Sequence, residues 1–322
     1  MQAKMKVVFL DSKTFSSTIS FDKIAEQCSE LVCYDHTISD EVIERCLNAE
    51  IVITNKVELT GEILVQLKHL KLICVAATGT NNIDLLAAKE LNICVKNVRD
   101  YAGTSIAQYV FSQLFEHYQH IASHNQNVKK GLWHKNSTKK QSFCFHGNTI
   151  TELAGKTLGI IGYGTLGKSV AKVAQAFDMN ILISEHKGES KIREGRVSFD
   201  YLLQHSDIVS LHCPQTPETI NLIDKYALSL MRSNTVLINT ARGTLIDNSA
   251  LINALKSHQI SHAFLDVLDQ EPPPANHPLL VYQATTLPYS PLTITAHIAW
   301  ASEQAQQRLI DMIGKNIYHF NK

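Results

Sequence analysis

A glycine-rich turn marks the part of the chain whose residue types and spacing best suit a nucleotide. An apolar run at residues 157–161 leads into Gly162, Tyr163, Gly164, Thr165, Leu166 and Gly167, the pattern G-x-G-x-x-G between a predicted strand and a predicted helix. In this pattern Gly162 permits the tight turn, Gly164 lets the backbone approach a pyrophosphate, and Gly167 lets the helix pack on the strand. The amino end of the helix then faces the phosphates, so the turn predicts dinucleotide binding.

The same turn also fits a second phosphate-binding pattern. Lys168 and Ser169 follow the last glycine, as in the G-x-x-x-x-G-K-[ST] loop of nucleoside triphosphatases. A triphosphatase would need magnesium and would ignore NADH, so the two interpretations differ in their ligands.

An acidic residue downstream favours the dinucleotide. Glu185 lies 18 residues after Gly167, at the end of the next predicted strand, close to the usual spacing of about 20. An acid there accepts hydrogen bonds from the adenosine ribose and repels a 2′-phosphate, which favours NAD over NADP. The adjacent His186 and Lys187 weaken this preference.

Four later predicted strands also end in segments that carry polar side chains. These segments are His212, Cys213 and Pro214 after residues 208–211, Thr240, Ala241 and Arg242 after 235–239, Asp266 after 262–265, and Ala296 and His297 after 292–295. Ligands of doubly wound sheets bind beyond the carboxyl ends of the strands, so we expect one crevice to gather these residues.

Three of the side chains near these strand ends suit acid–base chemistry on a carboxylate substrate. Arg242 offers a planar fork that matches a carboxylate, although an interdomain ion pair is the alternative role. His297 is a candidate proton donor and acceptor. Glu271 would orient that ring and stabilise its protonated form if the two side chains touch.

Composition limits the classes of partner. The chain has 322 residues, is 44% hydrophobic, and balances 30 Lys and Arg against 30 Asp and Glu, so we expect about two domains and no nucleic-acid partner. Its apolar runs are too short to cross a bilayer, which predicts a soluble cytoplasmic protein with no membrane partner. The seven cysteines include no C-x-x-C pair and predict neither disulfides nor zinc.

Hydrophobic patterning predicts two parallel sheets joined by helices. Strands are expected at residues 6–10, 51–54, 71–76 and 93–95 in the first hundred residues, and at 157–161, 180–184, 208–211, 235–239, 262–265 and 292–295 later. One long helix is expected over residues 103–121, with Ser105 and Gln108 as a capping box, and a non-periodic loop over 131–151 that docks on a neighbouring surface. The amphipathic segment 303–320 is expected to pack back on the first domain.

Three histidines on the long helix raise the question of a metal. His117, His120 and His124 share one helical face. Glu116 is the one acid nearby and no cysteine accompanies them, so a solvated or interdomain face is the better interpretation, and no metal is predicted.

The ordered motifs of the chain resemble those of the D-isomer-specific 2-hydroxyacid dehydrogenases, most closely the glycerate dehydrogenase (hydroxypyruvate reductase) members. The resemblance spans nearly the whole chain and rests on residues 76–84, the glycine turn with Glu185, and residues 211–214, 239–243, 266–272 and 297–299. It implies an α/β fold with two doubly wound parallel-sheet domains, a flavodoxin-like substrate domain over residues 1–102 and 297–322 and a Rossmann NAD-binding domain over 103–296. It also implies a homodimer that interconverts D-glycerate and hydroxypyruvate, with glyoxylate as a further substrate.

The resemblance also assigns roles. Arg242 would hold the substrate carboxylate and carbonyl, His297 would exchange the proton, and Glu271 would support His297. The implied cofactor contacts are Thr104 and the glycine turn at the phosphates, Cys213 and Pro214 at the adenosine, Thr240 and Ala241 at the nicotinamide half, and Asp266 at the carboxamide. Backbone amides around Thr78 and Gly79 would hold the substrate carboxylate.

Two departures from the family pattern stand out, and two alternatives stay open. Ala296 replaces the usual proline before the histidine, and Glu185 stands where aspartate is commoner. The alternatives are an NAD-binding regulatory relative without turnover and a P-loop nucleoside triphosphate enzyme.

Overall fold

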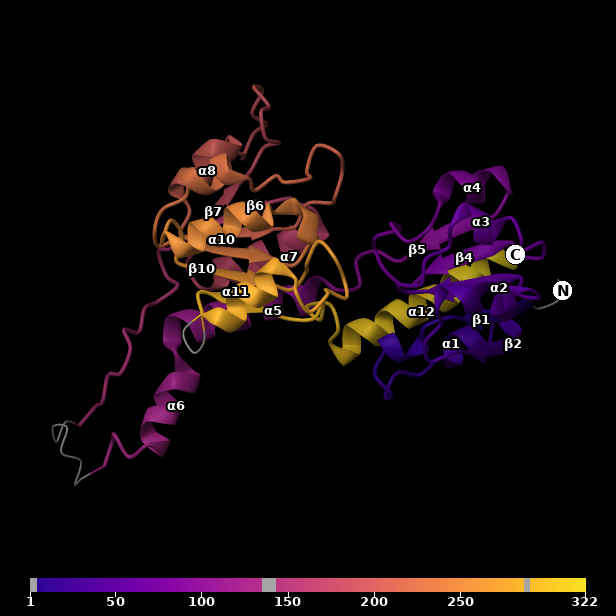
Figure 1. Cartoon of the computed structure of the whole chain (residues 1–322), viewed down its shortest axis with the longest axis horizontal. Coiled ribbons are helices and arrows are strands. Elements are labelled where there is room, and N and C mark those ends of the chain that lie inside the picture. The colour runs from indigo at the N-terminus through magenta and orange to yellow at the C-terminus, as the bar shows by residue number, and fades with distance from the viewer. Residues whose placement is uncertain (1–4, 135–142, 287–289) are drawn as a thin grey trace. The chain divides into compact units, whose positions relative to one another are not determined.

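The structure is a computed structural model that describes residues 5–134, 143–286 and 290–322. The chain divides into two compact units, Met1–Ala102 with Trp300–Lys322, and Gly103–Ala299 (Figure 1). Each unit is built on one parallel sheet, so the predicted doubly wound α/β class is confirmed. Among the described residues, no helix combines the length and apolar character that crossing a membrane requires.

The first unit contains a five-stranded sheet in the order β2-β1-β3-β4-β5. Its strands are β1 (Met5–Phe9), β2 (Cys28–Cys33), β3 (Ile51–Thr54), β4 (Leu72–Val75) and β5 (Cys94–Asn97). This order is the flavodoxin-like one. Strand β2 was not predicted, because half of the residues in this edge strand are exposed and it lacks a continuous apolar run.

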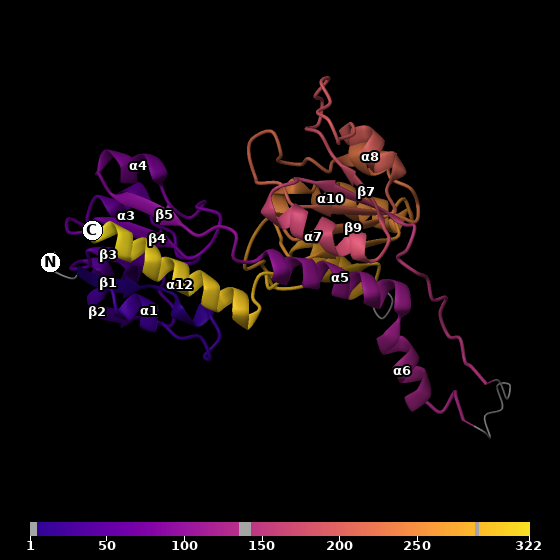
Figure 2. The ribbon, with the colours of Figure 1, turned by 180° about the vertical axis from the view of Figure 1, so that it is seen from behind.

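Helices cover both faces of this sheet. They are α1 (Asp22–Ala25), α2 (Val42–Cys46), α3 (Gly61–Leu64), α4 (Leu85–Glu90) and α12 (Glu303–Phe320), with short 3-10 turns at Ser12–Thr14 and Ser39–Glu41. Helices α2, α3 and α4 share one apolar core with the sheet, and α12 packs against α1 and β4 (Figure 2). The last helix therefore returns to the first unit, as its apolar face predicted.

The second unit contains a six-stranded parallel sheet in the order β11-β10-β9-β8-β6-β7. Its strands are β6 (Thr157–Ile161), β7 (Asn180–Ile183), β8 (Ile208–Leu211), β9 (Val236–Asn239), β10 (His262–Leu265) and β11 (Leu292–Ile294). Beyond β7, Val197 forms an isolated parallel bridge with Ser184. Val197 therefore occupies the position of the third Rossmann strand, and the winding reverses between β6 and β8, where dinucleotides bind.

The helices of the second unit also form two layers. They are α5 (Gly103–Gln119), α6 (Ile121–Lys129), α7 (Thr165–Ala176), α8 (Phe199–His205), α9 (Lys225–Leu230), α10 (Asn248–Lys256) and α11 (Pro278–Thr285), with a 3-10 turn at Gly243–Leu245. Helices α8 to α11 bury apolar residues in a common core with the sheet, whereas α5 and α7 pack together on the opposite face (Figures 1 and 2).

The expected single long helix is wrong in two details. It breaks at His120, whose left-handed backbone (φ 53°) separates α5 from α6. Ser105 is not a cap, because it lies inside α5 and its Oγ donates to the carbonyl of Ala299. The predicted loop at 131–151 has no helix or strand in its described parts, and residues 135–142 lie outside the described residues.

The histidine face of α5 is more buried than expected. The His117 ring lies 5.2 Å from the ring of His262 and 5.9 Å from that of Phe264, both on β10. Burial lowers the pKa of His117 to about 4 and that of His262 to about 3. Both rings are therefore neutral in the folded chain near neutral pH, and His117 is not on a solvated face.

This burial makes stability depend on pH. In the unfolded chain these histidines accept a proton near pH 6.5, so below that pH the unfolded state binds more protons and the free energy of unfolding falls until the folded pKa values are reached. We expect a loss of about 1 to 2 kcal/mol per histidine at about pH 5. Denaturant unfolding should show a smaller loss for His262→Gln than for the wild type. His319→Gln, at an exposed site on α12, is the control, and equal pH dependence in all three proteins would contradict the assignment.

Candidate active site

The glycine turn between β6 and α7 has the geometry of a phosphate cradle. Gly162 has φ 95°, and an added Cβ would lie 2.4 Å from the backbone nitrogen of Cys213. A Cβ on Gly167 would lie 2.2 Å from the Gly162 carbonyl oxygen, whereas one on Gly164 would meet nothing within 4 Å. Protein atoms therefore fill the space beside Gly162 and Gly167, whereas the space beside Gly164 is open. No side chain caps the amino end of α7, where a phosphate would bind.

The triphosphatase interpretation finds no support in this turn. Ser169 lies within α7, and its hydroxyl donates to the carbonyl of Thr165 at 2.9 Å. Its Oγ also lies so close to the start of α5 that a Cβ on Gly103 would approach it to 2.5 Å. The hydroxyl that would bind magnesium in a P-loop is therefore turned toward the packing of α5 on α7, and Thr104 is the residue after Gly103 at the start of α5.

Two buried polar side-chain atoms lie just beyond the carboxyl ends of β8 and β9. The Oγ1 of Thr240, after β9, and the Nδ1 of His212, after β8, have no hydrogen-bond partner among the described residues. Buried polar atoms are normally satisfied by protein, water or ligand. These atoms and the open glycine turn fit a dinucleotide laid across the ends of β6, β8 and β9, where Cys213, Pro214 and Ala241 also lie.

Glu185 stands where the sequence analysis expected it, directly beyond β7, but its carboxylate is already engaged. Its side chain is only 1% exposed and forms an ion pair with Arg193 through both oxygens; the Nε of Arg193 lies 2.7 Å from Oε2. This hydrogen-bonded pair lowers the pKa of Glu185 to about 2. No local pattern indicated Arg193, because a loop separates it from β7.

Glu271 and His297 meet, which the sequence alone left open. The Nδ1 of His297 lies 2.6 Å from Oε2 of Glu271, and both side chains are partly exposed. The other oxygen of Glu271 accepts a hydrogen bond from the backbone nitrogen of Leu268 at 2.9 Å. The pair therefore has a fixed orientation in which a carboxylate faces the imidazole, an arrangement that supports proton transfer.

The loop that carries His297 is held by Asp266. His297 has a left-handed backbone (φ 55°), which is uncommon for residues other than glycine. Its backbone nitrogen donates to the Asp266 carbonyl at 2.8 Å. The buried Asp266 carboxylate accepts hydrogen bonds from the backbone nitrogens of Ile298 (2.9 Å) and Ala299 (2.8 Å) and from the hydroxyl of Thr295 (2.6 Å). Asp266 therefore positions the histidine loop, a role that the sequence analysis did not anticipate.

Arg242 follows β9 and lies beside the Glu271 loop. The backbone of Gly243 is so close to that loop that an added Cβ would lie 1.9 Å from the carbonyl carbon of Leu268. Asn239 shapes the turn, because its side chain accepts from Ala241 N and donates to Arg242 O. The Arg242 guanidinium donates to the Ala241 carbonyl at 2.6 Å and pairs with no carboxylate among the described residues of its own unit.

The remaining candidates lie in the first unit, in the loop after β4. Thr78 donates its hydroxyl to the carbonyl of Val98 at 3.1 Å, and Asn97 donates its side-chain amide to the carbonyl of Thr78 at 2.6 Å. These bonds tie the segment that contains Thr78 and Gly79 to the end of β5.

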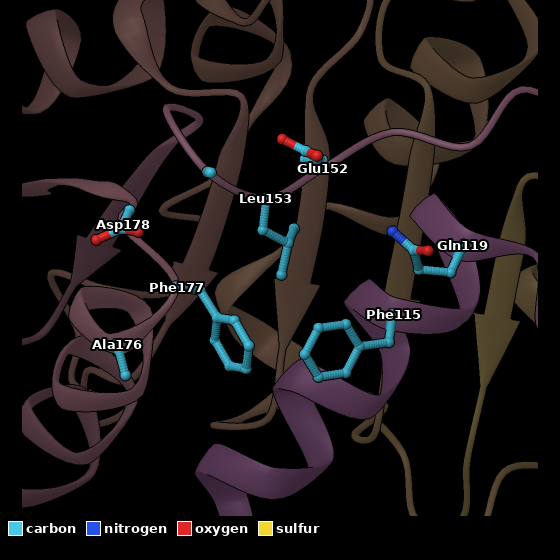
Figure 3. A pocket seen from close by; sticks show the side chains of 8 residues that line it. Phe115, Gln119, Glu152, Leu153, Ala176, Phe177 and Asp178 are labelled. Atoms are coloured by element: carbon cyan, nitrogen blue, oxygen red, sulfur yellow. The ribbon is translucent and has the colours of Figure 1, made fainter.

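A pocket of the second unit lies away from these residues. It is lined by Phe115, Gln119, Glu152, Leu153, Ala154, Ala176, Phe177 and Asp178 (Figure 3). It sits at the carboxyl end of α7, whereas the glycine turn adjoins the amino end of the same helix. The pocket therefore belongs to the opposite edge of the sheet from the candidate site.

Comparisons with known proteins agree with this geometry. Residues 111–299 match the family profile described as D-isomer specific 2-hydroxyacid dehydrogenase, NAD binding domain. The glycerate dehydrogenase of Methylorubrum extorquens is 40% identical over 98% of this chain and 96% of its own. The hydroxypyruvate reductase of Blautia hydrogenotrophica is 35% identical over 99% and 97%.

A solved structure extends the likeness to three dimensions. The D-lactate dehydrogenase from Aquifex aeolicus, complexed with NAD and lactic acid, superposes with a TM-score of 0.79 at 28% identity and covers 98% of this chain and 95% of that one. With the glycine turn at the switch point, the profile match and full-length relatives above 30% identity, this chain belongs to the D-isomer-specific 2-hydroxyacid dehydrogenase family and is an NAD-binding oxidoreductase.

Proposed function

We propose that this enzyme interconverts D-glycerate and hydroxypyruvate with NAD, and that it also reduces glyoxylate. The observation that carries the proposal is the Glu271–His297 pair, with Nδ1 and Oε2 2.6 Å apart, at the strand ends of an NAD-binding sheet. Two full-length relatives carry the names glycerate dehydrogenase and hydroxypyruvate reductase, which supports the choice of substrate. A non-catalytic role would give this pair no purpose.

In the proposed reaction His297 moves the proton. With Nδ1 held by Glu271, Nε2 is the nitrogen that gives a proton to the carbonyl oxygen during reduction and accepts it during oxidation. Glu271 keeps the ring oriented and stabilises its positive charge. General acid–base help of this kind contributes about 100- to 10,000-fold to a rate.

Arg242 supplies the second half of the proposed site. Its guanidinium binds the substrate carboxylate through two parallel hydrogen bonds and polarises the adjacent carbonyl. The bound cofactor supplies the hydride chemistry. The glycine turn and Thr104 would hold its phosphates, Cys213 and Pro214 its adenosine, and Thr240, Ala241 and Asp266 its nicotinamide half.

The first test is a panel of 2-oxo acids with NADH. We expect oxidation of NADH with hydroxypyruvate and glyoxylate, and formation of the D-isomer of glycerate. His297→Asn should lower kcat by about 100-fold or more while NADH affinity, measured by fluorescence titration, stays unchanged. Asparagine is chosen because it tolerates the left-handed backbone of this position. Lack of NADH oxidation with every 2-oxo acid, or full turnover by the variant, would refute the proposal.

The second test concerns the negative charge of Glu271. Glu271→Gln keeps a hydrogen-bond acceptor for Leu268 but removes the negative charge that faces the imidazole. The ring then loses the carboxylate that orients it and balances its charge, so kcat for reduction should fall by about tenfold or more while NADH affinity stays unchanged. Glu189→Gln, a charge change on an exposed loop, should leave kcat in place. An unchanged kcat in Glu271→Gln would mean that the pair does not govern proton transfer.

We also propose that the enzyme works as a cytoplasmic homodimer. Helix α6 extends away from the sheet of its unit and has no buried residue (Figure 1). Its Ile121 and Val128, seven residues apart on one face, are 64% and 47% exposed, and Trp133 and Phe143 beyond it are also exposed. These exposed apolar side chains suit contact with a second copy of the chain. All seven cysteines are free thiols, which suits a reducing compartment.

Sedimentation equilibrium tests the dimer. The wild type should sediment at twice the mass of one chain, and the double variant Ile121→Asp/Val128→Asp at the mass of one chain, because two buried charges would be placed in the interface. Leu86→Asp, at a 77% exposed apolar residue of the first unit, is the control and should leave the mass unchanged. A wild type with the mass of one chain would rule out the dimer.

A further inference from the structure

The end of β7 presents cations to solvent instead of the carboxylate expected there. The side chain of Glu185 is 1% exposed, whereas that of Arg193, which pairs with it, is 53% exposed. Arg193 donates to Glu185 through Nε, Nη2 and its backbone nitrogen, and the other N–H groups of its guanidinium have no hydrogen-bond partner among the described residues. The carboxylate is thus covered, and the guanidinium that covers it faces outward with donors to spare.

Of the neighbouring side chains, Arg196 adds a second cation at the strand end. His186 is 80% exposed at its side chain and lies 3.9 Å from Oε1 of Glu185. Arg196 donates to the carbonyl of Ser184 at 2.8 Å, which keeps its charge at the strand end. Lys187 takes no part, because Asp224 binds its ammonium at 2.7 Å. Glu189 is the acid of this loop that acts on Arg193 electrostatically.

We propose that Arg193 determines cofactor specificity: by covering Glu185 it converts the adenosine-ribose site into one that accepts a 2′-phosphate, so that the enzyme uses NADPH as well as NADH. The inference rests on the proposed function only in placing the adenosine end of the dinucleotide beyond β7. A free carboxylate at this position repels the 2′-phosphate. A guanidinium paired with that carboxylate removes the repulsion and offers planar N–H donors that suit phosphate oxygens.

The ion pair also explains how NADH remains a ligand. Arg193 is half exposed, so its side chain lies at the surface of the loop, and shifting it toward solvent would return the oxygens of Glu185 to the ribose hydroxyls. One pair of residues thereby serves two cofactors. The loop residue, and not the strand-end acid alone, sets the preference.

The test is calorimetric binding of ADP, 2′,5′-ADP and inorganic phosphate to the full-length chain. The wild type should bind 2′,5′-ADP at least as tightly as ADP. Arg193→Gln should weaken 2′,5′-ADP by about tenfold or more and change ADP by less than about threefold, because it removes the cation and uncovers the carboxylate. The kcat/KM ratio of NADPH to NADH should fall by a similar factor.

A double variant distinguishes two effects of Arg193, which are covering the carboxylate of Glu185 and attracting the 2′-phosphate directly. When residue 185 is already glutamine (Glu185→Gln), Arg193→Gln should weaken 2′,5′-ADP binding by a smaller factor than it does in the wild type, because no carboxylate is uncovered. Arg232→Gln is the matched control: this half-exposed arginine also faces an acid, Asp207, but at the amino ends of the strands. Melting temperatures confirm that each variant is folded.

Three outcomes would overturn the inference. They are a wild type that binds 2′,5′-ADP more than about tenfold more weakly than ADP, equal weakening of both nucleotides in Arg193→Gln, and displacement of 2′,5′-ADP by equimolar inorganic phosphate, which would indicate a general anion site. Failure of the proposed function looks different, because it leaves these affinities in place and abolishes NADH oxidation with 2-oxo acids.

Discussion

The buried carboxylate of Asp266 is the constraint on which the arrangement of the candidate active site depends. It is 1% exposed and accepts hydrogen bonds from Thr295, Ile298 and Ala299. A buried carboxylate without such partners is costly, so β10 can end in this residue only while the following turn brings those donors to it. The same turn gives His297 its left-handed backbone, which directs the ring toward Glu271. The hydroxyl of Tyr109, on α5, lies 2.6 Å from the hydroxyl of Thr295 and so connects these hydrogen bonds to the helix layer.

The proposed catalytic groups come together because parallel strands end at one edge. Adjacent strands β8, β9 and β10 deliver the segments with His212, Arg242 and Asp266 to neighbouring positions, and β11 delivers His297 next to them. Close backbone contacts then set the fine spacing. Only glycine fits at 162 beside Cys213 and at 243 beside Leu268, so the loops pack directly on one another.

Two buried acids at the same edge of the sheet are satisfied in different ways, with different consequences. Asp266 is satisfied mainly by backbone donors of the chain, which contribute geometry and no net charge. Glu185 also accepts backbone hydrogen bonds, from His186 and Arg193, but the half-exposed guanidinium of Arg193 cancels its charge and presents a cation to solvent. The hydrogen bonds to Asp266 fix a loop, whereas the pairing of Glu185 with Arg193 places a cation at the surface of the site.

Much of the fold was determined by the sequence itself. Continuous apolar runs marked ten of the strands, because a parallel sheet covered on both faces needs such runs, and the glycine spacing marked the cofactor turn. No comparable local pattern indicated the exposed edge strand β2, the break at His120 or the Val197 bridge. Three features were decided only by tertiary structure: the contact of Glu271 with His297, the brace from Asp266, and the cover of Arg193 over Glu185. Each joins residues in separate segments, so their meeting depends on how loops pack after the sheet has formed, which local pattern does not encode.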